Sequence, residues 1–331
     1  IIGSRLLEKV STMRGLVITL VALTFFSAMF ITNDVALVTF VPFAVAVLIM
    51  AGQEDKTILV VTLMTIGANV GSMLTPIGNA HNLYLKALTG MPTMEFLGIM
   101  APYSGTAAVL LVIVISVVFG GKPVGDLGDL ETGVLAPERN KHQPDEIRIT
   151  GYGAGYGGWR TIVYSLLFIV CLLAVSDVIP LWVMCVIVVV VFLFTDRRVF
   201  KYVDWGLPLT FCMFFIFIGN MKRVPEFYEL ARSLVGGHPL EVAVGSSQVI
   251  SNVPTTILLS GFCDQWRDLI IGTNLGGMGT LIASMASLIS YKNVVRQYPH
   301  KKGRYLAVYS AVNVLFLAVL LTLSWIIEPS L

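Results

Sequence analysis

The chain has 331 residues, of which 56% are hydrophobic and only 13% are charged, and its mean hydropathy is +0.83. Soluble domains usually carry about 25% charged residues, so the composition excludes a protein whose whole surface faces water. The formal net charge of +2 gives no indication of nucleic-acid binding. Because only helices and closed barrels satisfy the backbone within lipid, long apolar runs predict an all-α integral membrane protein.

Apolar segments follow one another along the chain. A helix needs about 20 apolar residues to cross the hydrocarbon core of a bilayer, and residues 97–119 and 305–327 each contain 23 residues without a charge. The candidate spanning or re-entrant segments are, in chain order, 15–32, 35–52, 57–85, 97–119, 161–176, 178–195, 205–221, 242–263, 269–291 and 305–327. Polar residues interrupt two of them, so the number of crossings stays open.

A single long polar stretch, residues 120–160, divides these segments into two groups. It holds six acidic residues and five Lys or Arg, and GYGAGYGG lies near its end. This composition is typical of a flexible connector. We therefore predict a first membrane repeat in 1–119, a polar connector in 120–160 and a second membrane repeat in 161–331. Basic loops at 196–201 and 292–304 predict that these loops, and with them the connector, lie on the cytoplasmic side.

The polar interruptions of the first group have counterparts in the second. Residues 65–85 and 270–290 match at a constant offset of 205 positions, and the identical pairs include Gly67 and Gly272, Asn69 and Asn274, Gly71 and Gly276, Met73 and Met278, Thr75 and Thr280, and Leu83 and Leu288. Upstream of each segment, an asparagine follows a hydroxyl residue, as in Thr32-Asn33 and Ser251-Asn252. Chance similarity between apolar segments is the alternative, but the shared Gly and Asn positions favour an internal repeat.

Interrupted helices at matching places in two halves indicate the binding site of a transporter. Irregular backbone survives within lipid only where protein or a water-filled cavity surrounds it. Half-helix N-termini attract anions, and free carbonyls attract cations such as Na⁺. The residues that we expect to bind substrate or ion are Thr32, Asn33, Asp34, Asn69, Gly71, Thr75, Pro76, Gly78, Asn79, Asn82, Ser251, Asn252, Thr255, Asn274, Gly276, Thr280, Ser284 and Ser287. Kinked helices with polar packing are the structural alternative.

Asp34 and His81 are titratable residues in these interruptions. Asp34 lies between the apolar runs 15–32 and 35–52, where a carboxylate is costly and marks a functional residue by default. It can take up a coupling proton, ligate a cation or cap the following helix. His81 is either a protonatable group of the site or a hydrogen-bonded scaffold residue. Because the interruptions contain no Arg or Lys, helix dipoles, amides, hydroxyls and a co-bound cation would hold an anion.

At five motifs the sequence resembles the ion-transporter superfamily, which includes arsenite permeases, citrate and dicarboxylate transporters, and related Na⁺/H⁺ antiporters. The motifs are TNDVALVTFVP (32–42), GANVGSMLTPIGNAHN (67–82), VDWGLPLTFCMFFIF (203–217), SSQVISNVPTTILLS (246–260) and GTNLGGMGTLIASMASLI (272–289). The similarity spans nearly the whole chain. It is greatest to the bacterial inner-membrane branch of citrate-transporter-like permeases.

The resemblance implies an elevator-type carrier, commonly a homodimer, built from two inverted repeats. Each repeat would contribute a re-entrant hairpin and a broken transmembrane helix, with a Na⁺ site near Asn33 and Asn252. The tips would be Thr32-Asn33-Asp34 and Ser251-Asn252-Val253, and the breaks would be 67–82 and 272–287. The comparison of the two halves also predicts that the first is N-terminally incomplete, by one to three helices.

Two features depart from the family pattern. Sodium-coupled dicarboxylate members carry Ser-Asn-Thr at both tips, whereas the third tip residue here is Asp34 in one half and Val253 in the other. Arsenite-permease-like members carry Gly-Asn-Pro-Pro-Asn where residues 78–82 read Gly-Asn-Ala-His-Asn. The first difference argues against sodium-coupled dicarboxylate transport and favours the arsenite-permease-like branch.

We therefore expect a secondary transporter, not an enzyme, with no cofactor other than Na⁺ or H⁺ as coupling ion. It would move a small anion or metalloid oxyanion, arsenite or carboxylate-like, across a bacterial or archaeal cytoplasmic membrane. Na⁺/H⁺ exchange through Asp34 is the main alternative. An ion channel is less well supported, because no charged ring or repeated filter sequence occurs. The hydrolase motifs HExxH and GxSxG and the Walker A motif are absent.

Overall fold

The computed structural model describes residues 12–120 and 158–327, apart from residue 204. The described residues form 14 α-helices and no β-strand. Six helical segments are long and apolar enough to cross a membrane, namely Met13–Ile31, Asn33–Met50, Glu54–Leu74, Thr93–Val118, Gly158–Val175 and Pro299–Ile327. The expected all-helical membrane protein is thereby confirmed, whereas most of the expected connector lies outside the described residues.

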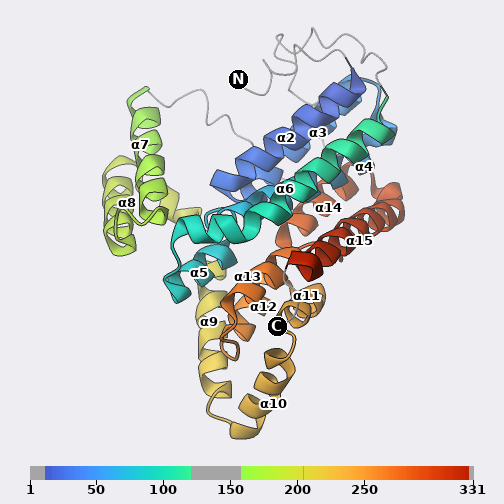
Figure 1. Ribbon diagram of the computed structural model, residues 1–331. Helices are drawn as coiled ribbons and strands as arrows, with labels where there is room; N and C mark the ends of the chain where they lie inside the picture. Colours follow the sequence, from blue (N-terminus) through green and yellow to red (C-terminus); the bar gives the residue numbers. More distant parts are fainter. Residues whose placement is uncertain (1–11, 121–157, 204, 328–331) are drawn as a thin grey trace. The chain divides into compact units, whose positions relative to one another are not determined.

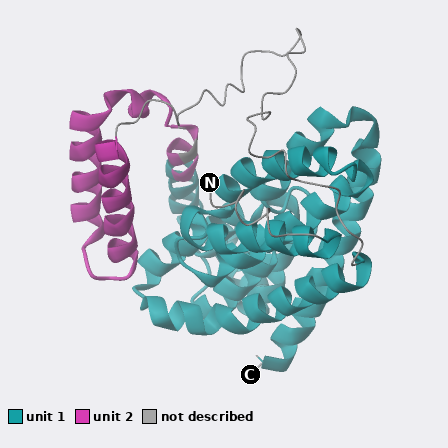
Figure 2. Ribbon diagram, turned by 90° about the horizontal axis from the view of Figure 1, so that it is seen from above, with its two compact units in different colours: residues 1–130, 212–331 teal, residues 131–211 magenta. Residues whose placement is uncertain are grey.

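The chain divides into two compact units, which are coloured separately in Figure 2. The smaller unit, residues 131–211, contains α7 (Gly158–Val175), α8 (Leu181–Thr195) and the 3-10 helix η3 (Arg197–Lys201). Helix α7 packs against α8, with the rings of Tyr164 and Phe192 stacked 5.6 Å apart. No residue of α8 is buried although nearly all of them are apolar, which is typical of a helix that faces lipid.

The larger unit, residues 1–130 and 212–331, begins with five helices. They are α2 (Met13–Ile31), α3 (Asn33–Met50), α4 (Thr57–Leu74), α5 (Ala80–Thr89) and α6 (Thr93–Val118), with the 3-10 helix η1 (Glu54–Lys56) before α4. Helix α4 is the centre of this unit, since 16 of its 18 residues are buried. It packs against α2, α3 and α6 from its own half, and against α14 and α15 from the second (Figure 1).

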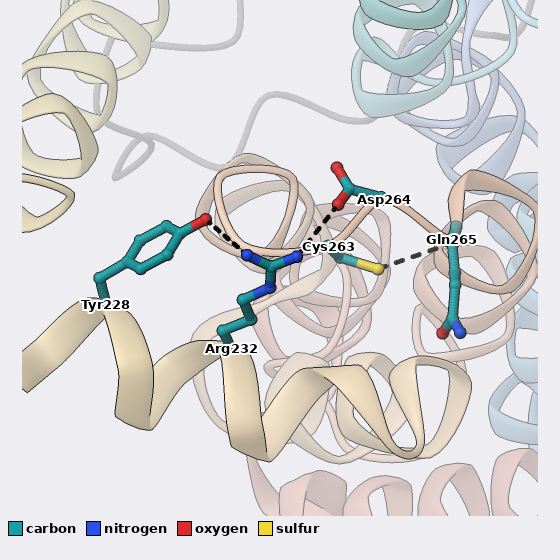
Figure 3. Close-up of polar contacts among 5 residues, drawn as sticks. All are labelled: Tyr228, Arg232, Cys263, Asp264 and Gln265. Atoms are coloured by element: carbon teal, nitrogen blue, oxygen red, sulfur yellow. Dashed lines mark hydrogen bonds and ion pairs between the residues drawn. The ribbon is translucent and has the colours of Figure 1, made fainter.

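Helix α9 (Gly206–Met221) leads from the smaller unit into the second half of the larger one. That half contains α10 (Pro225–Gly236), α11 (Pro239–Ile250), α12 (Asn252–Leu259), α13 (Trp266–Leu275), α14 (Met285–Gln297), the 3-10 helix η4 (Pro299–Lys301) and α15 (Lys302–Ile327). The amphipathic α10 contacts the segment that follows α12. One terminal guanidinium nitrogen of Arg232 in α10 lies 3.9 Å from the carboxylate of Asp264, and the other terminal nitrogen of Arg232 donates to the Tyr228 hydroxyl (Figure 3).

The helices of the second half repeat the contacts of the first. Helix α11 packs on α13 as α2 packs on α4, and α12 packs on α13 as α3 packs on α4. The correspondence extends across the halves, because α3 packs on α14 while α12 packs on α5. Helix α15 likewise contacts both α13 and α4, as α6 contacts both α4 and α13. Two groups of helices with the same element order therefore share one core.

Matching glycines permit the close helix contacts on which this core depends. A Cβ atom at Gly71 of α4 would overlap the backbone of Phe25 in α2. A Cβ atom at Gly276, just after α13, would lie 2.7 Å from the Cβ of Ser247 in α11. Small residues at helix contacts let backbones approach closely, which is a common source of packing energy in membrane proteins. The glycine pattern of the sequence thus has a structural cause in both halves.

Candidate functional site

Each half contains a pair of helices joined by a single residue with a left-handed φ angle. Thr32 connects α2 to α3 with φ 71° and ψ 152°, and Ser251 connects α11 to α12 with φ 71° and ψ 154°. Residues other than glycine rarely adopt this conformation, and it costs about 1–3 kcal/mol. The two predicted tips therefore share one uncommon backbone geometry.

Both tips are anchored to the break in their own half through equivalent backbone hydrogen bonds. The N–H of Asn33 donates to the carbonyl of Gly78 at 3.2 Å, and the N–H of Asn252 donates to that of Ala283 at 2.9 Å. Gly78 and Ala283 are separated by the same 205 positions as the matched glycines of the sequence. The tip and the break in each half thus form one local unit.

The expected helix breaks lie between α4 and α5 and between α13 and α14. In the first, the hydroxyl of Thr75 donates to the carbonyl of Met29 at 2.5 Å, and Pro76 and Gly78 belong to the turn that follows. In the second, the hydroxyl of Thr280 donates to the carbonyl of Gln248 at 3.0 Å. Met29 and Gln248 each precede their tip by three residues. The two threonines therefore attach the breaks to the hairpins in the same way.

Gln248 is a site residue that the sequence alone did not reveal. Its amide nitrogen donates to the carbonyls of Gly276 and Met278 at 2.9 and 3.0 Å, and its amide oxygen accepts from the N–H of Thr280 at 2.8 Å. These are backbone groups released where α13 ends, so one side chain satisfies three of them. The only sequence signal was a glutamine inside the apolar segment 242–263.

A network of buried amides joins the two halves. The side-chain nitrogen of Asn33 donates to the side-chain oxygen of Asn69 at 3.0 Å, and the hydroxyl of Ser284 reaches the same oxygen at 3.4 Å. The nitrogen of Asn69 donates to the carbonyl of Gly277 at 3.5 Å. The side chain of Asn252 lies against Gly277, because a Cβ there would be 2.9 Å from its amide nitrogen. Asn252 therefore lies directly against Gly277, and Asn33 is connected to it through Asn69.

A second link between the halves lies at the start of α5. The side-chain nitrogen of Asn274 donates to the side-chain oxygen of Asn82 at 2.7 Å. The nitrogen of Asn82 reaches the carbonyls of Ser72 and Thr75, each at 3.4 Å, and that of Asn79 donates to the hydroxyl of Ser72 at 2.8 Å. The amide of Asn82 thus satisfies carbonyls released where α4 ends, and that of Asn79 fixes the Ser72 hydroxyl beside them. Ser72 joins Gln248 as a residue that the sequence reading missed.

Other predicted residues occupy separate positions around this network. Ser287 is hydrogen-bonded to Tyr309 of α15 rather than to an asparagine. The hydroxyl of Thr255 is fully buried in α12 without a hydrogen-bond partner. The hydroxyl of Ser251 donates to the carbonyl of Ala283 at 3.3 Å. The predicted set therefore includes residues that hold the backbone in place as well as residues with unused polar groups.

Asp34 and His81 differ in their surroundings. Asp34 lies in the first turn of α3, where a negative charge is favourable, and one of its buried carboxylate oxygens has no hydrogen-bond partner. The N-cap position of α3 is Thr32. The imidazole of His81 is fully buried, and neither of its ring nitrogens has a hydrogen-bond partner among the described residues. Its role, as a protonatable group or as a scaffold residue, therefore stays a prediction.

Four helices begin at the tips and breaks, and in none of them does the N-cap side chain cap the backbone. They are α3 at Asn33, α5 at Ala80, α12 at Asn252 and α14 at Met285. The first N–H groups of a helix lack intrahelical acceptors and carry a partial positive charge. The network among Asn33, Asn69 and Ser284 brings the beginnings of α3 and α14 together. This arrangement offers amide donors and positive helix ends.

Comparison with known proteins shows the family of this chain. The family model described as "Citrate transporter" matches residues 1–265. The inner membrane protein YbiR of Escherichia coli (strain K12) is 30% identical over 300 residues, which cover 88% of this chain and 73% of that protein. The uncharacterized transporter MJ0456 of Methanocaldococcus jannaschii is 29% identical over 308 residues, covering 92% of this chain and 77% of that protein. The expected kinship is confirmed, and the chain belongs to the citrate transporter family of multi-pass membrane proteins.

Proposed function

We propose that this protein is a secondary transporter that binds a small anion between its two hairpin tips and its two helix breaks. The observation that carries the proposal is the buried hydrogen bond between Asn33 and Asn69. Asn69 is also hydrogen-bonded to Ser284 and Gly277, which belong to the other half. A polar centre shared by both halves is what alternating access around one site requires. The polar substrate would contact Thr32, Asn33, Ser251 and Asn252 first.

The chemistry of this centre favours an anion. Four helices begin here without a hydrogen bond from the N-cap side chain, and anions bind readily at the positive ends of helices. The N–H groups of Asn33 and Asn252 already donate to Gly78 and Ala283, and that of Asp34 donates to the side chain of Asn33, so α3 and α12 contribute mainly their positive ends. Amide and hydroxyl groups supply further donors. The hydroxyl of Thr255 is buried without a partner and is one group that a substrate oxygen would satisfy. A carboxylate-like anion or a metalloid oxyanion such as arsenite fits this donor set.

The helix lengths support a re-entrant hairpin in the second half. Helices α11 and α12 have 12 and 8 residues, about 18 and 12 Å at 1.5 Å per residue, whereas the hydrocarbon core is about 30 Å thick. Neither arm is long enough to cross, so we infer that the second hairpin enters and leaves on one side. The arms of the first hairpin, α2 and α3, have 19 and 18 residues and are long enough to cross. For that half the inference rests instead on the corresponding contacts of α2, α3 and α4. On this basis we infer two inverted repeats, at 1–119 and 161–331, with elevator-type movement.

Location, assembly and driving force complete the proposal. A relative named as an inner membrane protein supports placement in the cytoplasmic membrane. The basic loops of the sequence predict that the 120–160 connector lies on the cytoplasmic side. A homodimer is the expected assembly. Coupling to H⁺ or Na⁺ would supply the driving force, with Na⁺ held near Asn33 and Asn252 by carbonyl and amide oxygens. Such oxygens are the ligands that hard cations prefer.

Na⁺/H⁺ exchange is a second candidate function because Asp34 has a buried carboxylate oxygen without a partner. A carboxylate at this depth is a functional residue by default. In an exchanger, Asp34→Asn would abolish Na⁺-dependent proton movement, and no anion would be needed. In the proposed anion transporter, vesicles without anion would show no such movement, even with the wild-type chain.

Ligand-dependent thermal stability tests the proposal on the purified full chain in detergent. Citrate, succinate, phosphate, sulfate, arsenite and antimonite are compared, each with and without Na⁺. A ligand at a hundredfold excess over Kd stabilises the folded state by about 2.7 kcal/mol. We expect one of these anions to stabilise the wild type and to lose its effect in Asn33→Ala and Asn252→Ala.

Asn293→Ala is the matched control, because Asn293 is half-buried on α14 and its amide donates only within its own helix. This variant is expected to respond to the anion as the wild type does. Stabilisation by Na⁺ alone, lost in Asp34→Asn, would replace the anion transporter with the exchanger.

A further inference from the structure

A cavity of about 770 Å³ opens at the end of α8, within the smaller unit, and no residue of the proposed transport site lines it. Its polar lining consists of Arg160, Thr195, Asp196, Arg197, Arg198 and Tyr202. Three guanidinium groups thus accompany one carboxylate. The proposed transport site lies in the larger unit and does not explain why these arginines gather around a cavity of the smaller one.

Local contacts explain how the charges are held. The carboxylate of Asp196 accepts the N–H of Arg198 at 3.2 Å, so it caps the beginning of η3. The guanidinium of Arg197 donates to the carbonyl of Leu193 at 2.7 Å, at the end of α8. Arg160 lies over the ring of Trp159, 5.5 Å from its centre. The carboxylate of Asp196 is thus held by the backbone, and the three arginines against this one carboxylate give the lining an excess of positive charge.

The surroundings of the cavity resemble a membrane interface. Phe194 is 83% exposed and Tyr202 77% exposed, beside a helix in which no residue is buried. Exposed aromatic side chains at the end of an apolar helix are typical of the belt at lipid headgroups. The basic sequence DRRVFK at 196–201 belongs on the cytoplasmic side by the same rule. The leaflet on that side carries anionic lipid.

We propose that this cavity binds the phosphate of an anionic phospholipid, with the acyl chains against α7 and α8. Arginine forks pair with phosphate oxygens through two parallel hydrogen bonds, which makes them better phosphate ligands than lysine. A free phosphate would meet the same arginines. The lipid is favoured because the exposed apolar side chains of α8, Phe194 among them, adjoin the cavity and suit contact with acyl chains.

Thermal unfolding of the full chain in a neutral detergent tests this proposal. The probes are phosphatidylglycerol, phosphatidylcholine with the same acyl chains, and glycerol 3-phosphate. We expect phosphatidylglycerol alone to raise the unfolding temperature. Arg198→Gln and Arg197→Gln should weaken that response at least tenfold in lipid concentration, and Arg198→Lys should restore part of it.

Lys201→Gln is the matched control, because Lys201 belongs to the same 3-10 helix and is exposed but does not line the cavity. It removes the same charge and should leave the response unchanged. An equal response in Arg198→Gln and Lys201→Gln would overturn the proposal. Stabilisation by glycerol 3-phosphate as large as that by phosphatidylglycerol would also overturn it, in favour of a soluble phosphate ligand.

Native mass spectrometry gives a readout that does not depend on unfolding. It counts the phosphatidylglycerol molecules that each chain retains after detergent removal. The Arg198→Gln variant should retain one fewer than Lys201→Gln, and equal numbers would contradict the site even if the arginine variant were less stable.

Discussion

The side-chain amide of Asn33 donates a hydrogen bond to the side-chain oxygen of Asn69, at 3.0 Å and in a buried position. This contact joins the tip of the first hairpin to the helix that precedes the first break. Ser284 of the second half reaches the same oxygen. Asn69 is therefore the residue through which a tip, a break and the opposite half meet, and its replacement should affect all three.

Asn69→Ala should lower the free energy of unfolding by about 1–3 kcal/mol, because it leaves the buried amide of Asn33 without its acceptor. A double-mutant cycle with Asn33→Ala should give a coupling energy of about 0.5–1.5 kcal/mol. Chemical unfolding in detergent measures both. Asn293→Ala is the control and should change stability by no more than about 0.5 kcal/mol. Additive effects of Asn33→Ala and Asn69→Ala would contradict the contact.

Gly71→Ala and Gly276→Ala should each destabilise the protein by about 1–3 kcal/mol, since the new methyl group has no room against α2 or α11. Gly105→Ala in α6 is the control, because nothing lies within 4 Å of the position that its new methyl group would occupy. That control should raise stability by up to about 1 kcal/mol through helix propensity. Thermal unfolding compares the three variants, and the prediction fails if all three shift in the same direction.

Thr32→Gly should stabilise the fold, which is unusual for a residue at a proposed binding site. Removal of about 1–3 kcal/mol of backbone strain outweighs the about 0.5–1 kcal/mol that glycine costs in conformational freedom. Thr39→Gly, inside α3, is the control and should destabilise, because its φ is helical. Opposite shifts in unfolding temperature are expected. A loss of stability in Thr32→Gly equal to that in Thr39→Gly would show that the tip is not strained.

Gln248→Leu should lower stability by about 1–3 kcal/mol and abolish anion-dependent stabilisation, because three backbone groups of the second break lose their partner. Gln297→Leu provides the comparison, as Gln297 is exposed at the end of α14. Thermal unfolding with and without the anion separates the two effects. Retention of the full anion response in Gln248→Leu would mean that the second break does not shape the site.

Much of the helical architecture was predictable because it follows from local chemistry. The apolar segment 57–85 does divide at Gly, Pro and Asn residues, into α4 and α5. The segment 242–263 divides at Ser251, as the tip motif indicated. Glycine, proline and asparagine alter backbone preferences at their own positions, so their effect is visible in the sequence.

The contacts of the site were less predictable because they depend on how distant segments meet. The sequence indicated that Asn82 and Asn274 belong to breaks, but nothing in it indicated that the two amides bind each other. Gln248 was missed because a single glutamine in an apolar run has no distinctive spacing. The amphipathic α10 was also missed, since it is too short and too charged to stand out among spanning segments.

The most direct test of the central claim is uptake of the stabilising anion into vesicles that contain the purified full chain. We predict uptake that saturates with anion concentration, that falls at least tenfold in both Asn33→Ala and Asn252→Ala, and that persists in Asn293→Ala. Dependence on the asparagines of both tips would support one site shared by the two halves. Uptake that is unchanged in Asn252→Ala, or that rises linearly without saturation, would contradict the account.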